Sequence, residues 1–337
     1  MDNITHIVLG AAIGEAVAGK KIGKRALFAG ALAGNIPDID VFLSTYQSVP
    51  DSLLSHRGFT HSILFCVGAT FLFSWLFQRW KHSGSKDFKL WTIVFSLGLL
   101  SHILLDACTA YGTGWFEPFS HYRVSFNNIF VVVPFYTLPM LVSFIALLVL
   151  KRKSENRKWW NAAGFALSTA YLLYATVVKV TIDRDVEKNL AESKIPYKEY
   201  VTTPTPLNCF LWYVMVKDTT GFHLGYHSVF DKTEKIDFHY YPQNNALLAP
   251  YIRDEGVQKL VRFSEGYYCL TVQDTSQIDF HDLRFGQIGG WDDPAAPFIF
   301  SYHFGFAQNN AFVIQRGRFS IASKEAISSL VSRIEGR

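Results

Sequence analysis

The sequence lacks several features that mark common classes of metalloprotein and nucleic-acid-binding protein. It has four cysteines, Cys66, Cys108, Cys209 and Cys269, and no CxxC pair, so a zinc site built from thiolates is not expected. The net charge is only +4 over 337 residues, which gives no indication of nucleic acid as a partner. No internal repeat or low-complexity segment is present. Any metal chemistry must therefore use histidine and carboxylate side chains.

What the sequence does contain is apolar surface, unevenly distributed along the chain. Hydrophobic residues make up 49% of it, and the mean hydropathy is slightly positive, at +0.13. That is too apolar for an ordinary soluble enzyme and too polar for a pure membrane bundle. We therefore expect a membrane-embedded part joined to a soluble part.

Six apolar segments occupy the first half of the chain. A membrane span needs roughly 20 mostly apolar residues, and four segments approach this length: 62–77, 90–110, 129–150 and 159–180. Two shorter stretches, 4–19 and 26–37, come first and carry small residues spaced for close helix packing. The sequence thus predicts a mainly α membrane bundle of about four to six transmembrane helices.

Basic loops predict the orientation of this bundle. Lysine and arginine cluster in 20–25, 79–89 and 151–158, and basic residues in short loops mark the cytoplasmic side. If all three loops are inside, the six segments alternate without conflict. The N-terminus, the connections 35–61 and 111–128, and everything after 181 then lie outside. We predict a multi-pass protein of the cytoplasmic (inner) membrane with its C-terminal domain on the extracytoplasmic side.

The character of the sequence changes near Asp183. The segment DRDVEKNLAESK reads as a polar helix, and 208–231 alternates around a turn at 218–221, as a β-hairpin does. GYYCLTVQ and FIFSYHFGF are further strand candidates. We expect a membrane-embedded helical domain over 1–182 and a smaller soluble, mostly β (α+β) domain over 183–333. The last four residues, IEGR (334–337), resemble a protease-cleavage linker and are left out of this prediction.

Histidine and aspartate gather at the ends of the apolar segments. In LSHRGFTHSILF, His56 and Arg57 precede a turn at Gly58, and Thr60 is the predicted N-cap of the helix that contains His61. In SHILLDACTAYGT, His102 and Asp106 are four residues apart, which puts them on one helix face. Ionisable groups there are costly in a membrane without partners, so they indicate function.

The predicted topology brings these residues to the outer face, together with Asp38 and Asp40 of NIPDIDVF and with His6. Taken singly, His6 could be an interfacial residue, the two aspartates turn formers and Arg57 a membrane anchor. Taken jointly, they predict a metal site, because imidazole and carboxylate without thiolate suit zinc, manganese or iron. The metal-ligand candidates are His6, Asp38, Asp40, His56, His61, His102 and Asp106.

Seven candidates exceed what one tetrahedral ion with an open position requires. They would fit two ions bridged by Asp38 or Asp40, an arrangement that supports phosphoester hydrolysis. Arg57 would contact developing negative charge, and Asp40 and Arg57 are the catalytic candidates. Zinc is the favoured metal, with manganese or iron as alternatives.

Several motifs together resemble a known family. THIVLG, GNIPDIDVF, HRGFTHS, SHILLDACTAYGT and PFS occur in this order, followed by PTPLNCFLWYVMV and GYHSVFD. They resemble the LexA-regulated inner-membrane metal-dependent hydrolases, also called the YdjM/YbcI-like family. The resemblance implies a multi-pass membrane protein with metal-dependent hydrolase activity. The order of histidines and aspartates is also similar to the sites of zinc-dependent phospholipase C and P1-type nucleases.

The chain departs from the family pattern after PFS. Acidic residues are frequent there in the family, whereas this sequence has Asn127 and Val133, so the resemblance does not extend to an accessory role of such acids.

The resulting hypothesis is a membrane-bound hydrolase that uses a metal-activated water on a lipid or amphiphilic (phospho)ester at the membrane interface. One alternative is a transporter or metal-handling protein. The other is a non-catalytic helix bundle that a structural metal site stabilises. The sequence does not indicate an oligomeric state.

Overall fold

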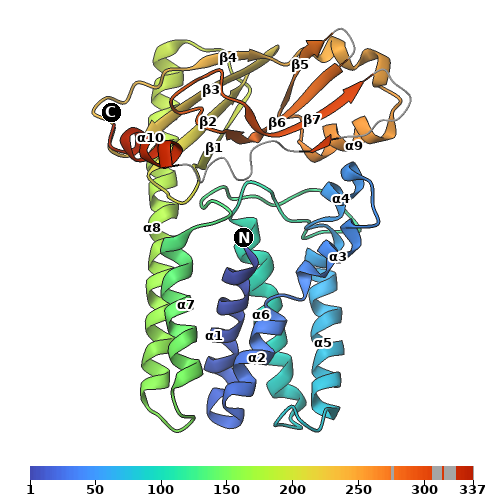
Figure 1. Cartoon of the computed structure of the whole chain (residues 1–337), viewed down its shortest axis with the longest axis vertical. Coiled ribbons are helices and arrows are strands. Elements are labelled where there is room, and N and C mark those ends of the chain that lie inside the picture. The colour runs from blue at the N-terminus through green and yellow to red at the C-terminus, as the bar shows by residue number, and fades with distance from the viewer. Residues whose placement is uncertain (275–276, 306–312, 315–323, 337) are drawn as a thin grey trace. The chain divides into compact units, whose positions relative to one another are not determined.

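The computed structural model describes residues 1–274, 277–305, 313–314 and 324–336 (Figure 1). The chain divides into two compact units. A helical unit contains Met1–Tyr46 and Ser55–Ala175, and a sheet-rich unit contains Gln47–Leu54 and Thr176–Arg337. The helical N-terminal region and the sheet-rich C-terminal region that the sequence predicts are thus confirmed. A short segment from the first half, 47–54, belongs to the second unit.

The helical unit is built from long helices and short connecting turns. Its elements are α1 (Asn3–Ile22), α2 (Lys24–Ala33), the 3-10 turn η1 (Pro37–Ile39), α3 (Asp40–Ser44), the 3-10 turn η2 (Phe59–His61), α5 (Ile63–Arg79), α6 (Phe88–Ala107), α7 (Pro134–Val149) and the first part of α8 (Asn156–Ser193). Small and large apolar side chains, including Ala29, Ala33, Phe95 and Leu99, form its core between α1, α2, α5 and α6. Because these helices pack against one another, their intervening turns meet at the two ends of the unit.

Helices α1 and α2 pack unusually closely. A Cβ atom added at Gly10 would overlap the carbonyl oxygen of Gly30, and one added at Gly14 would overlap that of Ala26. Only glycine permits such an approach of two backbones, which confirms the close packing predicted from the small residues. This contact positions the chain that leaves α2 and enters η1.

By length and composition, two of the described helices could each cross a membrane, namely α6 and α8. A third span is possible if the bent pair Val49–His61 and Ile63–Arg79, which meet at 59°, counts as one. Helix α7 is apolar but shorter, at 16 residues. The protein therefore has two to three candidate spans, and the larger number of four to six remains a prediction.

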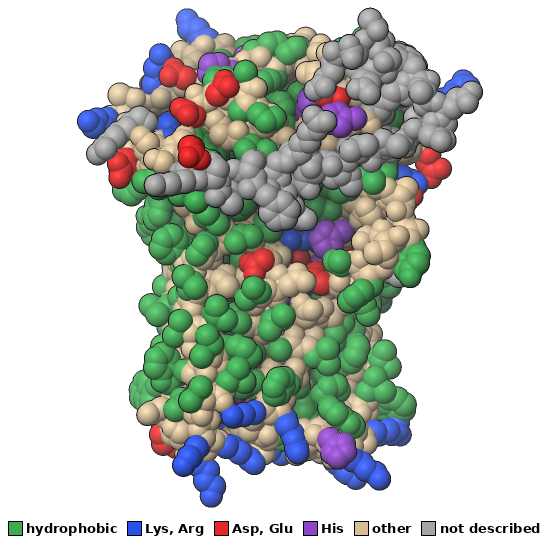
Figure 2. Space-filling model, in the orientation of Figure 1, with side chains coloured by type: hydrophobic (Ala, Val, Ile, Leu, Met, Phe, Trp, Pro, Cys, Tyr) green, Lys and Arg blue, Asp and Glu red, His purple; other side chains and the backbone are tan. Residues whose placement is uncertain are grey.

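The outer surface of the helical unit suits a membrane. Hydrophobic side chains cover its flank, and lysine and arginine gather at the end where the α1–α2, α5–α6 and α7–α8 connections lie (Figure 2). Phe71 of α5, Leu138 of α7 and Leu173 of α8 are among the exposed apolar residues. An apolar flank with a basic end is the pattern of a helical membrane protein.

The N-cap of helix α5 lies two residues later than predicted. Ser62 is the N-cap, and its side chain accepts a hydrogen bond from the Phe65 amide. Thr60 was the predicted cap, and that prediction was wrong, because residues 59–61 form the separate turn η2. The Thr60 hydroxyl instead contacts Asp40 and His61. Sequence preference alone does not distinguish two neighbouring hydroxyl residues.

Within the residues that the structure describes, the sheet-rich unit contains two antiparallel four-stranded sheets. The first is β1 (Glu199–Pro204), β2 (Leu211–Lys217), β3 (Gly221–Ser228) and β4 (His239–Pro242), and the second is β5 (Tyr268–Asp274), β6 (Gln277–Gln287), β7 (Phe298–Gly305) and β8 (Val313–Ile314). The predicted hairpin at 208–231 is confirmed as β2 and β3, in which Trp212 pairs with His227. Both further strand candidates are also confirmed, as β5 and β7.

Helical segments complete this unit. They are α4 (Val49–Ser55), the second part of α8, the turn η3 (Asn245–Tyr251), α9 (Glu255–Phe263) and α10 (Lys324–Ile334). Val49 and Leu53 of α4 pack against the core around Leu260, and Asp51 lies 2.6 Å from the Lys259 ammonium. Helix α10 ends at Ile334, whose side chain packs with the cluster of Leu211, Trp291 and Leu330.

Candidate metal centre

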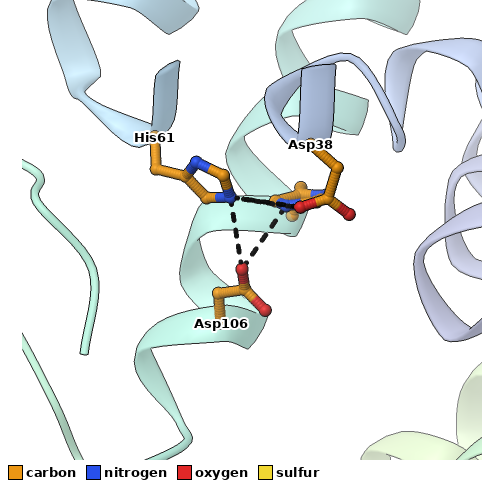
Figure 3. Close-up of side chains that lie close together, drawn as sticks. Asp38, His61 and Asp106 are labelled. Carbon is orange, nitrogen blue, oxygen red and sulfur yellow. Dashed lines mark hydrogen bonds and ion pairs between the residues drawn. The ribbon is translucent and has the colours of Figure 1, made fainter. Parts of the chain in front are cut away.

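Four buried polar side chains from three elements meet at one end of the helical unit. His102 and Asp106 lie on the last turns of α6, Asp38 lies in η1 and His61 ends η2. Their donor atoms all lie within 4.8 Å of one another. Asp38, His61 and Asp106 point toward a common point (Figure 3). The fold thus brings these four predicted residues together at one end of the helical unit.

The distances within this four-donor group fit a tetrahedral ion. The Nε2 atoms of His61 and His102 are 3.1 Å apart. Both lie 3.4 Å from Asp106 Oδ2, and they lie 3.5 and 3.6 Å from Asp38 Oδ1. Tetrahedral ligands at about 2.0–2.1 Å from zinc would be separated by roughly 3.3 Å. Five of the six donor separations therefore match a single small cation.

A second group adjoins the first. Asp38, Asp40 and His56 also bring donor atoms within 4.8 Å of one another. Because Asp38 belongs to both groups, it is the natural candidate for a bridging carboxylate. The sequence left the choice between Asp38 and Asp40 open. Three protein donors would leave one position of a tetrahedral ion for another molecule, as catalytic zinc sites do.

Neighbouring groups orient the histidines. His102 Nδ1 lies 2.7 Å from the carbonyl oxygen of Gly34, and that carbonyl can only accept, so Nδ1 carries the proton. In the neutral ring this leaves the lone pair of Nε2 directed at the site, the arrangement typical of metal-ligating histidine. The Nδ1 atom of His61 lies 3.0 Å from the Thr60 hydroxyl. Both rings therefore present Nε2 to the four-donor group.

His6 is placed differently from the other six candidates. Its Nε2 lies 3.0 Å from Asp106 Oδ1, and its ring stacks on that of His102 at a centroid distance of 3.7 Å. It belongs to neither donor group of the described residues. The structure thus places His6 outside both donor groups, in contact with Asp106 and His102, where it supports the orientation of these two side chains.

Arg57 is buried beside the same carboxylates. Its Nε lies 3.1 Å from Asp106 Oδ2, its Nη1 donates to the Thr109 hydroxyl at 2.7 Å, and its amide donates to Asp40 Oδ2 at 3.0 Å. Its φ of +57° is uncommon for a residue with a side chain, and such conformations concentrate at functional sites. Nη2 is the guanidinium nitrogen that these contacts do not use.

The carboxylates of Asp38 in η1 and of Asp40 at the start of α3 remain ionised. Burial raises the pKa of Asp38, but hydrogen bonds with His102 and His61 outweigh it and hold this pKa well below its usual range. Burial likewise raises the pKa of Asp40, but contacts with His56, His61 and the Arg57 amide lower it by more than burial raises it. The net shift of this pKa is therefore downward. Ionised carboxylates are the form that binds a cation.

Sequence reasoning missed several residues of this centre. Gly34 and Thr109 contribute a backbone carbonyl and a hydroxyl, and Tyr111 and Arg123 lie against His56 and Arg57. Arg123 is separated from His56 by 67 residues in the chain, so no spacing pattern could have joined them. Asn127 and Val133 lie in neither donor group of the residues described.

The chain is similar to two bacterial proteins. The chain is 35% identical to inner membrane protein YbcI of Escherichia coli (strain K12) over 122 residues, which is 36% of this chain and 69% of YbcI. It is 24% identical to the uncharacterized protein YfhP of Bacillus subtilis (strain 168) over 329 residues, which is 90% of this chain and 91% of YfhP. No solved structure matches the chain.

The family model described as YdjM inner membrane protein matches residues 1–182, which include both donor groups. The match covers more than half of the chain, and the resemblance seen in the motifs is confirmed. The protein belongs to the YdjM family of inner membrane proteins.

Proposed function

We propose that this protein is a divalent-metal-dependent hydrolase that cleaves a lipid or amphiphilic phosphoester at the membrane interface. The observation that carries the proposal is the pair of donor groups that share Asp38. One group offers four donors and the other three, so one position stays open for substrate or water.

Each residue of the centre has a distinct proposed role. Bound divalent cations would supply Lewis acidity and an activated water, the chemistry that two-metal sites use on phosphoesters. His61, His102 and Asp106 would hold one ion, Asp40 and His56 the other, and Asp38 both. Asp40 belongs to the group with the open position. We therefore propose that its carboxylate accepts a proton from the attacking water. The Nη2 atom of Arg57 would contact negative charge on the substrate.

The membrane supplies the argument for an amphiphilic substrate. The donor groups lie at the end of α6 opposite the basic connections, among helices with an apolar flank. If the basic loops are cytoplasmic, the site faces the extracytoplasmic lipid–water boundary. A lipid headgroup would reach it there without leaving the bilayer.

One observation favours a second candidate function, a structural metal. Four protein donors in near-tetrahedral spacing are typical of closed structural sites. If an ion binds only to this group, it would join α6 to η1 and η2 without turnover. The transport alternative has no comparable support, because the donor groups gather at one end of the helices.

Arg57→Lys tests the hydrolase proposal. The substitution keeps the charge but loses the planar fork, so we expect metal content and fold to be retained. Turnover of a lipid phosphoester should fall by roughly 100-fold or more, the scale of losing one preorganised charge-stabilising group. The assay uses metal-loaded protein in lipid with phospholipids, lipid pyrophosphates and carboxylic esters.

Three results would count against the proposal. Full activity of Arg57→Lys would show that the guanidinium does not contact negative charge on the substrate. Loss of metal in the variant would make it structural. An inactive wild type across the whole panel would shift the conclusion to the structural-metal function.

A further inference from the structure

A second buried arginine accompanies Arg57 at this centre. The guanidinium carbon of Arg57 lies 4.9 Å from the centroid of the Tyr111 ring, and that of Arg123 lies 5.5 Å from the same centroid. The two arginine residues are only 4% and 9% exposed. The His56 ring meets Tyr111 edge-on at 5.2 Å. Tyr111 thus holds two cations beside a candidate metal ligand through cation–π contacts.

The backbone fixes Arg123 in this position. Thr113 and Val124 exchange two backbone hydrogen bonds, of 3.0 and 2.9 Å, in an isolated antiparallel bridge. Gly112 adopts φ +74°, and a Cβ there would come 2.9 Å from Arg123 Cβ. Nη2 of Arg123 donates to the carbonyl oxygen of His56 at 3.1 Å. The arginine is therefore tied to the peptide that joins His56 to Arg57.

The charges of the side chains explain why a second arginine matters. Asp38, Asp40 and Asp106 contribute three negative charges, and Arg57, Arg123 and the buried N-terminal ammonium of Met1, which pairs with Asp106, contribute three positive ones, which leaves no net charge. One divalent ion would change that net charge to +2, and two ions would change it to +4. Buried net charge is costly unless a counter-ion is present. A loaded centre therefore needs an anion.

We infer that Arg123 is a second anion-binding residue of this centre and that its ligand is a phosphate with two negative charges, as in a phosphomonoester. This inference rests on the proposed function and narrows its substrate class. A phosphomonoester carries about −1.5 to −2 charges at pH 7, whereas a diester carries one and a carboxylic ester none. Guanidinium forks match phosphate oxygens.

Anion binding can be measured without turnover. Inorganic phosphate is titrated calorimetrically into the metal-loaded, full-length protein in nanodiscs, and diethyl phosphate serves as the singly charged probe. The wild type should bind phosphate more tightly than diethyl phosphate. Arg123→Gln should weaken phosphate binding by roughly 10-fold or more, as expected for one lost charge-assisted contact, with metal content unchanged. The phosphate affinity of Arg123→Lys should lie between that of the wild type and that of Arg123→Gln.

Arg79→Gln is the matched control, because Arg79 also stacks on an aromatic ring, that of Trp75 at 4.2 Å, but is exposed at the basic end of α5. It should leave phosphate binding unchanged. Short-chain phosphatidic acid in the same titration separates the sources: tighter binding than phosphate assigns the anion to a lipid headgroup, and equal binding assigns it to free phosphate.

Two outcomes would overturn the inference. Either the metal-loaded wild type fails to bind phosphate, or Arg123→Gln loses metal together with phosphate. A wild type that binds phosphate through Arg123 but hydrolyses nothing would keep this inference and refute the proposed function, so the two failures can be told apart.

Discussion

Both ring nitrogens of His102 make contacts within the candidate metal centre. Nδ1 donates to the Gly34 carbonyl, and Nε2 lies within 3.6 Å of His61, Asp38 and Asp106. No other orientation of the ring would keep both sets of contacts, so His102 should be indispensable for the four-donor group.

His102→Ala should therefore lower zinc affinity by at least about 100-fold, since even loss of an orienting partner costs 10–100-fold. His82→Ala is the control, because His82 is exposed at the opposite end of the helices. The measurement is competition with a coloured zinc chelator. Equal affinities for the two variants would remove His102 from the site.

At the residue scale, the sequence pointed to residues that the fold brings together, and their role as metal ligands stays a prediction. Six of the seven candidates enter the two donor groups, because helix ends that carry ionisable residues must bring them together or expose them to lipid. The role of each residue could not be predicted as well from the sequence. His6 contacts Asp106 from behind, and Arg123 comes from a distant loop, since such contacts depend on tertiary packing.

The α1–α2 contact is the element on which η1 depends. Gly14 faces the Ala26 carbonyl, Gly34 ends α2 next to His6, and η1 with Asp38 follows within a few residues. The position of Asp38 therefore relies on the close approach of two backbones.

Gly14→Ala should force α1 and α2 apart and destabilise the protein by about 1–3 kcal/mol, the usual cost of overpacking. Gly68→Ala is the matched control, because a Cβ at Gly68 of α5 would meet nothing within 4 Å. That change should be neutral or stabilise by up to about 1 kcal/mol, since alanine favours helix. Thermal unfolding in one detergent measures both. Equal stabilities would contradict the close contact.

Most elements could be predicted from apolar periodicity, and the misses have physical causes. The apolar segment 159–180 and the polar helix after Asp183 form one continuous helix of 38 residues, because no glycine or proline interrupts it past Gly164. The packing of α4 against the core of the sheet-rich unit had no local signal, since its partners lie some 200 residues away in the chain.

At the scale of the whole molecule, the orientation in the membrane is a prediction that labelling can test. The basic connections predict a cytoplasmic end, and the loop after α6 should then be outside. The four native cysteines are buried, so the wild type gives little background in a labelling experiment.

A membrane-impermeant maleimide should label His121→Cys on intact cells, because His121 is exposed in the loop after α6. Lys86→Cys, exposed in the α5–α6 connection, should react only after permeabilisation. The reverse pattern would invert the orientation and move the proposed site to the cytoplasmic side.

The central claim is that two donor groups share Asp38. Elemental analysis of protein purified with excess zinc and then dialysed tests it most directly, with Asp38→Asn and His56→Ala beside the wild type. We expect about two ions per wild-type chain, because each donor group would hold one. His56→Ala should keep about one ion, since it leaves the four-donor group intact. Asp38→Asn should fall below one, because it weakens both groups. Two ions in Asp38→Asn, or none in the wild type, would contradict the account.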